Sequence, residues 1–295
     1  DLGSKMMECA GLIHERSWPV QVRLNATNRA LSNSQYSGGY FIHLLPGGGE
    51  YLDEERPTDD QGNLYKKARP HQDWTVHEQS AGGPPSPSGY VSDGWVKQTN
   101  EDLNDWNDIH NLFKVFTSAN PTVAEIEAVM NVDYWLRWQA FQVIINHNET
   151  NLSNGSNDDY GLYRGALDPR FIPLAHDFDT VWGDGGNTSG LTPTSPTDTI
   201  YQLNGNFGSG ETIPATQWLM SNPVLNQRFK AQLVELLNTV FLPAAFNPMV
   251  DSVLGDWTGP TAAYGVPVAK RDAIKTFNTS RRDHILQTVL GYDSL

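Results

Sequence analysis

The spacing of hydrophobic and polar residues predicts a small set of strands in the first third of the chain. Residues 20–24 alternate between apolar and polar side chains, and residues 40–45 form a second apolar run. A turn-rich stretch separates the two runs, and this order is typical of a β-hairpin. Residues 62–66 predict a further strand, and residues 2–13 and 50–56 predict helices.

Helical periodicity dominates the remainder of the chain. Residues 132–146 are apolar on nearly every side, and a helix of this composition is buried. Such a helix holds the polar loop that follows it, beginning at His147, at a fixed place relative to the core. The other expected elements are two helices, two strands and four further helices, at residues 100–118, 122–130, 160–164, 171–175, 215–220, 224–240, 248–254 and 268–290.

Two stretches rich in Gly, Pro and Ser, residues 70–92 and 183–197, are expected to be loops. The aromatic side chains in and beside the first stretch are expected to anchor it to the rest of the protein. These anchors are Trp74, Tyr90 and Trp95.

The order of the elements predicts an α+β fold. A small antiparallel β region at residues 1–99 would precede a mainly helical lobe at residues 100–295, with the functional site between them. The alternative is a single α+β domain without a cleft.

Composition supports a folded core and argues against two classes of partner. The chain is 38% hydrophobic and 11% aromatic, and its formal net charge is −14. This charge disfavours nucleic acid or an anionic membrane as the main partner. Cys9 is the only cysteine, so no intrachain disulfide can form. No apolar run reaches the roughly 18 residues of a membrane-spanning helix, and the start at Asp1 favours a piece of a longer protein.

Acidic and amide side chains gather against hydrophobic segments between His147 and Gly183. Asp177 and Asp179 lie two positions apart, and in an extended segment such side chains point to the same side. Two carboxylates placed in this way can share a hard cation such as Mg²⁺ or Ca²⁺. This stretch is therefore the candidate chemical site.

A second contributor to this site lies in the loop after the buried helix. Glu149 is followed by Asn154, then by the two strands and the acids. This order is the layout of a protein-kinase catalytic loop and its metal-binding Asp. The alternative is structural, because turns rich in Asn and Asp usually cap helices and close loops. His147 and His176 could be metal ligands, but hydrogen-bonding roles are favoured because oxygen donors predominate.

The motifs of this stretch resemble those of the CotH kinase family, which is named after spore coat protein H and is related atypically to the protein kinases. The features that carry the resemblance are Glu149 and Asn154 with their spacing, Leu162-Tyr163, and residues 172–179 with Gly183. Outside this stretch, a hairpin, an early strand and a closing helix of the family are similar to residues 37–45, 63–66 and 277–286, in that order.

The resemblance implies an atypical protein-kinase-like fold. It also implies phosphoryl transfer from ATP to Ser/Thr hydroxyls of an unidentified protein substrate, with Mg²⁺, Mn²⁺ or Ca²⁺ as the metal. Glu149 and Asp177 are the implied catalytic residues. Asp177 would also be the principal metal ligand, Asn154 the second ligand, and Asp179 a metal-site acid that orients the loop. The supporting residues are Asn148 and His176, and no nucleotide-binding residue is assigned.

Three departures from the family pattern leave an alternative open. The acid expected to end the family's second N-terminal strand is not evident at His43-Leu44. Glu149 stands where the family has Asp, and the family's upstream segment, which forms much of its nucleotide lobe, is expected to precede Asp1. The alternative function is a catalytically weak or inactive module with a structural or cell-surface role, binding Ca²⁺. A location outside the cell or at its surface, within a longer secreted protein, is favoured.

Overall fold

The computed structural model describes nine segments of the chain. They are residues 1–21, 23–28, 40–45, 47–68, 74–147, 160–183, 194–200, 221–255 and 268–291. Within them the protein is α+β, with small antiparallel sheets and many helices, as expected.

The largest sheet has four antiparallel strands in the order β6-β5-β7-β8. These strands are β5 (Asn63–Lys67), β6 (Trp95–Lys97), β7 (Tyr160–Arg164) and β8 (Phe171–Ala175). Strand β5 pairs with β7, so the sheet takes strands from both sides of the expected division at residue 99. The division into two parts stays a prediction, and the sheet is the element that joins them.

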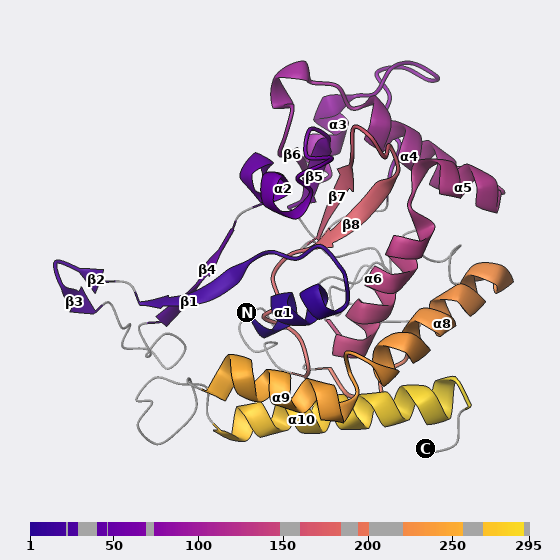
Figure 1. Ribbon diagram of the computed structural model, residues 1–295. Coiled ribbons are helices and arrows are strands. Elements are labelled where there is room, and N and C mark those ends of the chain that lie inside the picture. Colours follow the sequence, from indigo (N-terminus) through magenta and orange to yellow (C-terminus); the bar gives the residue numbers. More distant parts are fainter. Residues whose placement is uncertain are drawn as a thin grey trace.

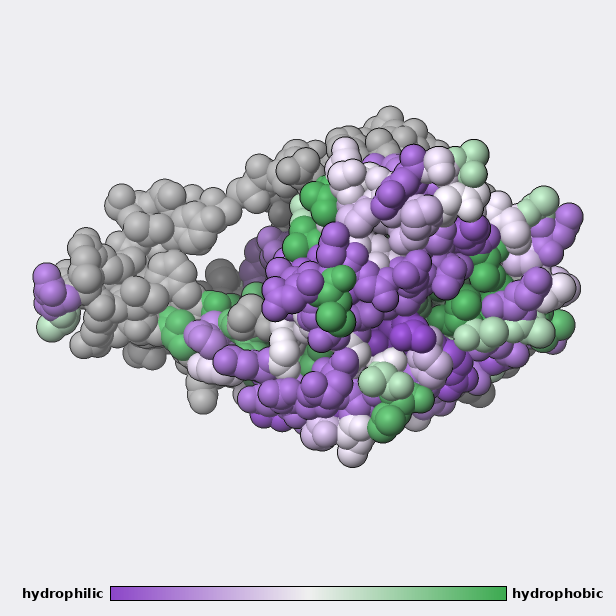
Figure 2. Space-filling model, turned by 90° about the horizontal axis from the view of Figure 1, so that it is seen from above, coloured by the Kyte–Doolittle hydropathy of each residue, from purple (hydrophilic) through white to green (hydrophobic). Residues whose placement is uncertain are grey.

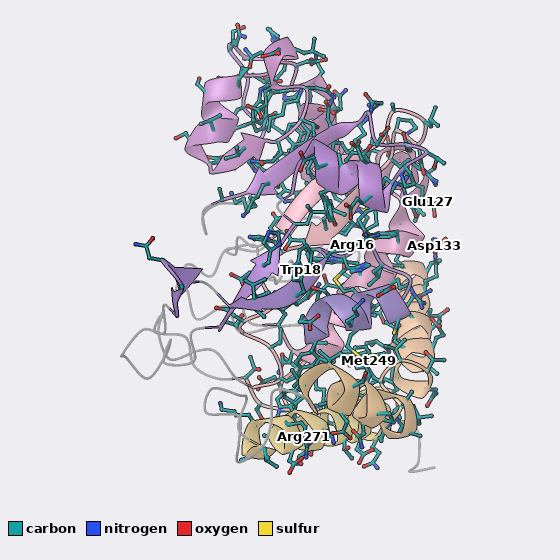
Figure 3. The ribbon with its side chains drawn as sticks, turned by 60° about the vertical axis from the view of Figure 1, so that its left-hand side comes forward. Arg16, Trp18, Glu127, Asp133, Met249 and Arg271 are labelled. Atoms are coloured by element: carbon teal, nitrogen blue, oxygen red, sulfur yellow. The ribbon has the colours of Figure 1, made fainter. Side chains whose placement is uncertain are left out.

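The expected hairpin extends from the body of the molecule (Figure 1). It pairs β1 (Ser17–Gln21) with β4 (Tyr40–Leu44), and β2 (Arg23–Leu24) pairs with β3 (Thr27–Asn28) at its far end. Trp18 stacks on its cross-strand partner His43, with 4.4 Å between ring centroids. In Figure 3, Arg16 and Trp18 lie at the base of this hairpin.

Helices surround the sheet and fill the lower half of the molecule in Figure 1. Helix α6 is paired closely with α8, and α10 lies along α9 and also reaches α6. The helices are α1 (Leu2–Cys9), α2 (Gly49–Glu55), α3 (Pro87–Ser92), α4 (Asn107–Thr117), α5 (Val123–Val129), α6 (Val132–Ile145), α8 (Pro223–Asn238), α9 (Pro243–Leu254) and α10 (Val268–Asp283), which continues as a π-helical turn, η3 (His284–Val289).

The sheet separates two hydrophobic clusters because successive side chains of a strand point to opposite faces. Tyr65 and Leu162 face the main core, which is built around the mostly buried helix α6. Leu64 and Leu174 face a smaller cluster, which α2 covers with Tyr51 and Leu52. The anchors expected from the sequence, Trp74, Tyr90 and Trp95, are all buried. The smaller cluster forms one wall of the candidate site.

Several expected elements have different bounds in the structure. Helix α4 begins at Asn107 rather than at residue 100, because Asn100 and Asn104 adopt left-handed backbone conformations around a short 3₁₀ turn, Glu101–Leu103. The expected loop 70–92 contains α3, which begins with a proline at a position that suits it. The helix expected at residues 2–13 ends at Cys9.

Further differences concern the middle and the C-terminal third. Strand β6 was not expected, and the helix expected at residues 248–254 begins at Pro243. The helix expected at residues 215–220 lies outside the described residues. In the part of the chain that the structure describes, no single helix is long and apolar enough to cross a membrane. Among the described helices, the pair α8 and α9, bent by 65°, meets those criteria when the two are taken together.

Candidate functional site

The loop that follows α6 begins in a tightly held position. Asn146 ends the helix in a left-handed conformation, and its side-chain amide donates to Ser195 O at 2.8 Å and to the Asp198 carboxylate at 3.2 Å. His147 is fully buried, and its Nδ1 lies 3.1 Å from the side-chain oxygen of Gln142. The predicted catalytic residue Glu149, the metal ligand Asn154 and the supporting Asn148 lie outside the described residues.

Burial determines the charge state of His147. Loss of solvent lowers the pKa of its imidazole to about 3, so the ring is neutral at physiological pH. The backbone of Asp177 acts in the opposite direction and raises the pKa of His147 by less than burial lowers it. Nε2 of His147 has no well-formed hydrogen bond with any described residue. His147 is therefore a neutral, buried ring whose polar contact among the described side chains is with Gln142, and the favoured hydrogen-bonding role stays a prediction.

The acidic segment begins where β8 ends. His176, Asp177 and Phe178 are half-buried, and Asp179 is exposed. The extended backbone expected for this segment is wrong at Asp177, whose φ of +52° is left-handed. A left-handed residue turns the chain. Side chains two positions apart point to the same side only in an extended segment, so this expectation does not hold for the carboxylates of Asp177 and Asp179.

Two contacts bring the acidic segment against the end of α6. The rings of His147 and Phe178 stack with 5.5 Å between centroids. The backbone N–H of Trp182 donates to Ile145 O at 2.9 Å, and Trp182 is left-handed as well. The structure therefore brings the end of α6 and the first residue of its following loop against the acidic segment.

His176 has a partner that the sequence did not reveal. Its Nδ1 lies 2.6 Å from the carboxylate of Glu15, which is buried between α1 and β1. The two residues are 161 positions apart, so no local pattern could have linked them. The pair fixes the first residue of the acidic segment to the segment that leads into the hairpin.

A pocket lies beside this pair, over one face of the four-stranded sheet. Its lining includes Glu15, Tyr51, Leu64, Lys66, Gly161, Leu174 and His176. The cavity volume is about 130 Å³, which roughly four liquid waters would fill. Counting its open mouth, the empty space is about 550 Å³. Among these lining residues, only His176 was named from the sequence, as a supporting residue of the site.

The floor of this pocket is open because of a glycine. Lys66, Gly161 and Leu174 form one row across β5, β7 and β8. A Cβ on Gly161 would meet Tyr65 O at 3.1 Å and the Leu64 side chain at 3.4 Å. Any larger side chain would therefore fill the space between Lys66 and Leu174.

A second cavity lies on the other side of the acidic segment. It has a volume of about 390 Å³ and is lined by Phe178, Asp179 and Trp182 together with residues of α1, α9 and α10. His176 thus lines one cavity and Asp179 the other. The two ends of the segment have different surroundings, which agrees with the turn at Asp177.

The predicted metal ligands lie partly outside the described residues. No three His, Cys, Asp or Glu side chains among them are grouped closely enough to hold a metal ion. The carboxylate oxygens of Asp177 and Asp179 are suitable donors for a hard cation, and the amide of Asn154 would add another. These oxygen donors are of the kind that Mg²⁺ prefers. Asn154, the second predicted ligand, lies outside the described residues.

The fold and site define an α+β domain with a pocket over one face of its four-stranded sheet, beside the start of a turned acidic segment. The sequence profile of the CotH kinase protein family matches residues 2–257, and the chain belongs to this family. The family suggests in general terms the use of a nucleotide and a divalent metal. The likeness noted at residues 277–286 lies beyond the matched range. No curated protein compared with the chain matches it.

Proposed function

We propose that this chain is an ATP- and Mg²⁺-dependent phosphotransferase domain that acts on Ser/Thr hydroxyls of a protein substrate. The observation that carries the proposal is the stacking of His147 on Phe178. This contact joins the start of the loop that contains Glu149 to the segment that contains Asp177. Phosphoryl transfer requires a proton acceptor and a metal-binding acid within reach of one phosphate group.

The pocket supports the nucleotide part of the proposal. Leu64 and Leu174 offer apolar surfaces to a flat ring, and Gly161 leaves room between them. The ammonium group of Lys66 forms no hydrogen bond or ion pair with a described residue, which leaves its charge available to a phosphate. The enclosed volume is small, so the sugar and phosphates would lie in the open mouth.

Each acidic residue has a separate role in this proposal. The metal-bound nucleotide supplies the phosphoryl group together with a cation that neutralises its charge. Asp177 and Asn154 would hold that cation through their side-chain oxygens, and Asp179 would orient the segment. Glu149 would accept the proton of the substrate hydroxyl.

Thermal unfolding in the presence of Mg-ATP tests these roles. A ligand that binds only the native state raises the midpoint, so Mg-ATP should stabilise the parent protein. Asp177→Asn should abolish most of the shift, and Asp179→Asn should reduce it less. Glu149→Gln should keep the shift and lose transfer of labelled phosphate to a protein acceptor, because only the proton acceptor is removed.

The matched control is Asp102→Asn, which neutralises an exposed acid in the 3₁₀ turn between β6 and α4. Its shift should equal that of the parent. If Asp177→Asn responds to Mg-ATP as the parent does, the metal assignment is wrong. A shift with Ca²⁺ alone and none with Mg-ATP would favour the non-catalytic, cation-binding module instead.

A further inference from the structure

Glu15 is a buried carboxylate in the segment between α1 and β1. Its side chain is 7% exposed, and it lines the pocket over the sheet. A buried Glu side chain is rare unless it is paired. The hydrogen-bond partner of Glu15 among the described side chains is the imidazole of His176, whose Nδ1 lies 2.6 Å away. This short contact fixes the two side chains relative to each other.

The backbone on either side of Glu15 is held by other parts of the protein. The Ile13 N–H donates to the hydroxyl of Tyr134, in α6, at 2.9 Å. The Arg16 carbonyl accepts from the Leu45 N–H, at the base of the hairpin, at 3.0 Å. The carboxylate is therefore a fixed point relative to α6, and the imidazole that contacts it is fixed in turn.

His176 is the residue at which the chain leaves the sheet. Strand β8 ends at Ala175, and the left-handed Asp177 comes directly after His176. An anchored ring restricts the backbone of His176, and this backbone sets the place of the Asp177 carboxylate. The stacking of Phe178 and the hydrogen bond of the Trp182 N–H act further along the segment. The contact at His176 is thus the one that adjoins the predicted metal ligand.

We propose that Glu15 is a positioning residue, whose carboxylate holds His176 so that Asp177 faces the metal of the bound nucleotide. This inference rests on the proposed nucleotide-dependent function. It gives the segment between α1 and β1 a role in a site whose acids lie far away in the sequence. Residues that orient a metal ligand typically contribute about 10- to 100-fold to metal affinity.

Calorimetric titration of ADP, once in excess Mg²⁺ and once with a chelator, tests the inference. The ratio of the two affinities measures what the metal contributes to binding, and it should exceed one in the parent. Glu15→Leu removes the acceptor and fills the same buried space, so it should lower the ratio about tenfold and leave the metal-free affinity unchanged. Glu15→Gln should keep most of the ratio, because its side-chain oxygen can still accept from an imidazole N–H. Glu15→Ala gives the same test if Glu15→Leu does not fold.

A double-mutant cycle shows whether Glu15 acts through His176. His176→Ala should lower the ratio as much as Glu15→Leu does, because both remove the same contact. The double variant should then lower it no further. Losses that add in the double variant would overturn the inference, since Glu15 would then act independently of His176.

Asp93→Ala is the matched control. Asp93 is also buried and paired with a histidine, His77, but it lines neither of the two cavities. This variant should lower thermal stability and leave the ratio unchanged.

Three further outcomes separate the inference from the proposed function. The same ratio in Glu15→Leu and the parent would overturn the inference and leave the proposed function intact. An equal loss of ADP affinity with and without Mg²⁺ would also overturn the inference, because the whole pocket and not the metal would then be affected. Absence of ADP binding to the parent, or a parent ratio of one, would overturn both.

Discussion

At the scale of single residues, three left-handed conformations mark the candidate site. Asn146, Asp177 and Trp182 all have φ values of +52° or +53°, and they lie where α6 meets the acidic segment. Non-glycine residues seldom adopt this conformation, and when they do, they cluster at functional sites. Asn and Asp tolerate it better than most residues, so the sequence alone does not reveal the turn at Asp177.

Substitutions at Asp177 test this conformation without any ligand. Asp177→Asn and Asp177→Gly should change the free energy of unfolding by less than about 0.5 kcal/mol, since both residues accept a positive φ. Asp177→Ala should lower it by about 1 kcal/mol, because a Cβ without a local hydrogen bond is strained there. Urea unfolding with a chelator present measures all three. Asp102→Ala serves as the control, since Asp102 has no positive φ. Equal stability of the Ala and Asn variants would contradict a left-handed Asp177.

At the scale of elements, long and strongly patterned segments were predictable, and short or locally unusual ones were not. Helix α6 was expected because residues 132–146 are apolar on nearly every side of a helix, and β7 and β8 were expected from their apolar runs. Strand β6 has three residues, too few for a recognisable alternation. The partnership of Glu15 with His176 depends on the complete fold, so it could not be read from local patterns.

Helix α3 shows how an unexpected element is held in place. The hydroxyl of Tyr90, in α3, lies 2.7 Å from Nδ1 of His110, in α4. Loss of solvent lowers the pKa of His110, and the cation of Lys114 adds to this, while Glu78 opposes it. The folded protein therefore binds a proton at His110 less readily than the unfolded chain does.

The sign of the pH effect follows from this shift. The stabilising contribution of neutral His110 is complete above the unfolded pKa of about 6.5 and is lost as pH falls below it. Urea unfolding between pH 7 and pH 5 should therefore show a smaller loss of stability in His110→Gln than in the parent. His147 and His284 also have lowered pKa values and contribute equally to both proteins. Identical slopes in the two proteins would show that His110 does not titrate differently on folding.

At the scale of the whole molecule, one hydrophobic core runs from α1 to the end of α10. Arg137 of α6 binds the Ala10 carbonyl at 2.6 Å and Gln232 of α8 at 2.8 Å, which ties three helices together. Arg228 of α8 pairs with Glu127 and Asp133, which are labelled in Figure 3. The face seen in Figure 2 is mainly hydrophilic, as expected for a chain with a net charge of −14.

The core also extends past the matched family region, because α10 begins after residue 257. Phe277 and Arg281 of α10 are buried, and Arg281 donates to the Val143 carbonyl of α6 at 3.0 Å and to Pro196 O at 3.1 Å. Asn278 donates to Phe241 O at 3.0 Å. Helix α10 therefore holds both the C-terminal end of α6 and the segment that supports Asn146, although it lies outside the match.

A chain that ends at residue 257 should fail to unfold as a single cooperative unit. Burial of one large apolar side chain contributes about 2 kcal/mol, and hydrogen bonds from a charged group about as much each. Their combined loss is on the order of 5 kcal/mol or more, comparable to the whole stability of a typical domain. Urea unfolding followed by tryptophan fluorescence should show a broad transition with a reduced m-value. Arg281→Lys in the full chain should weaken stability by a smaller amount, since a lysine cannot reach all these carbonyls at once. If the shortened chain unfolds with the midpoint and m-value of the full chain, α10 is an appendage, and the end of α6 is held without it.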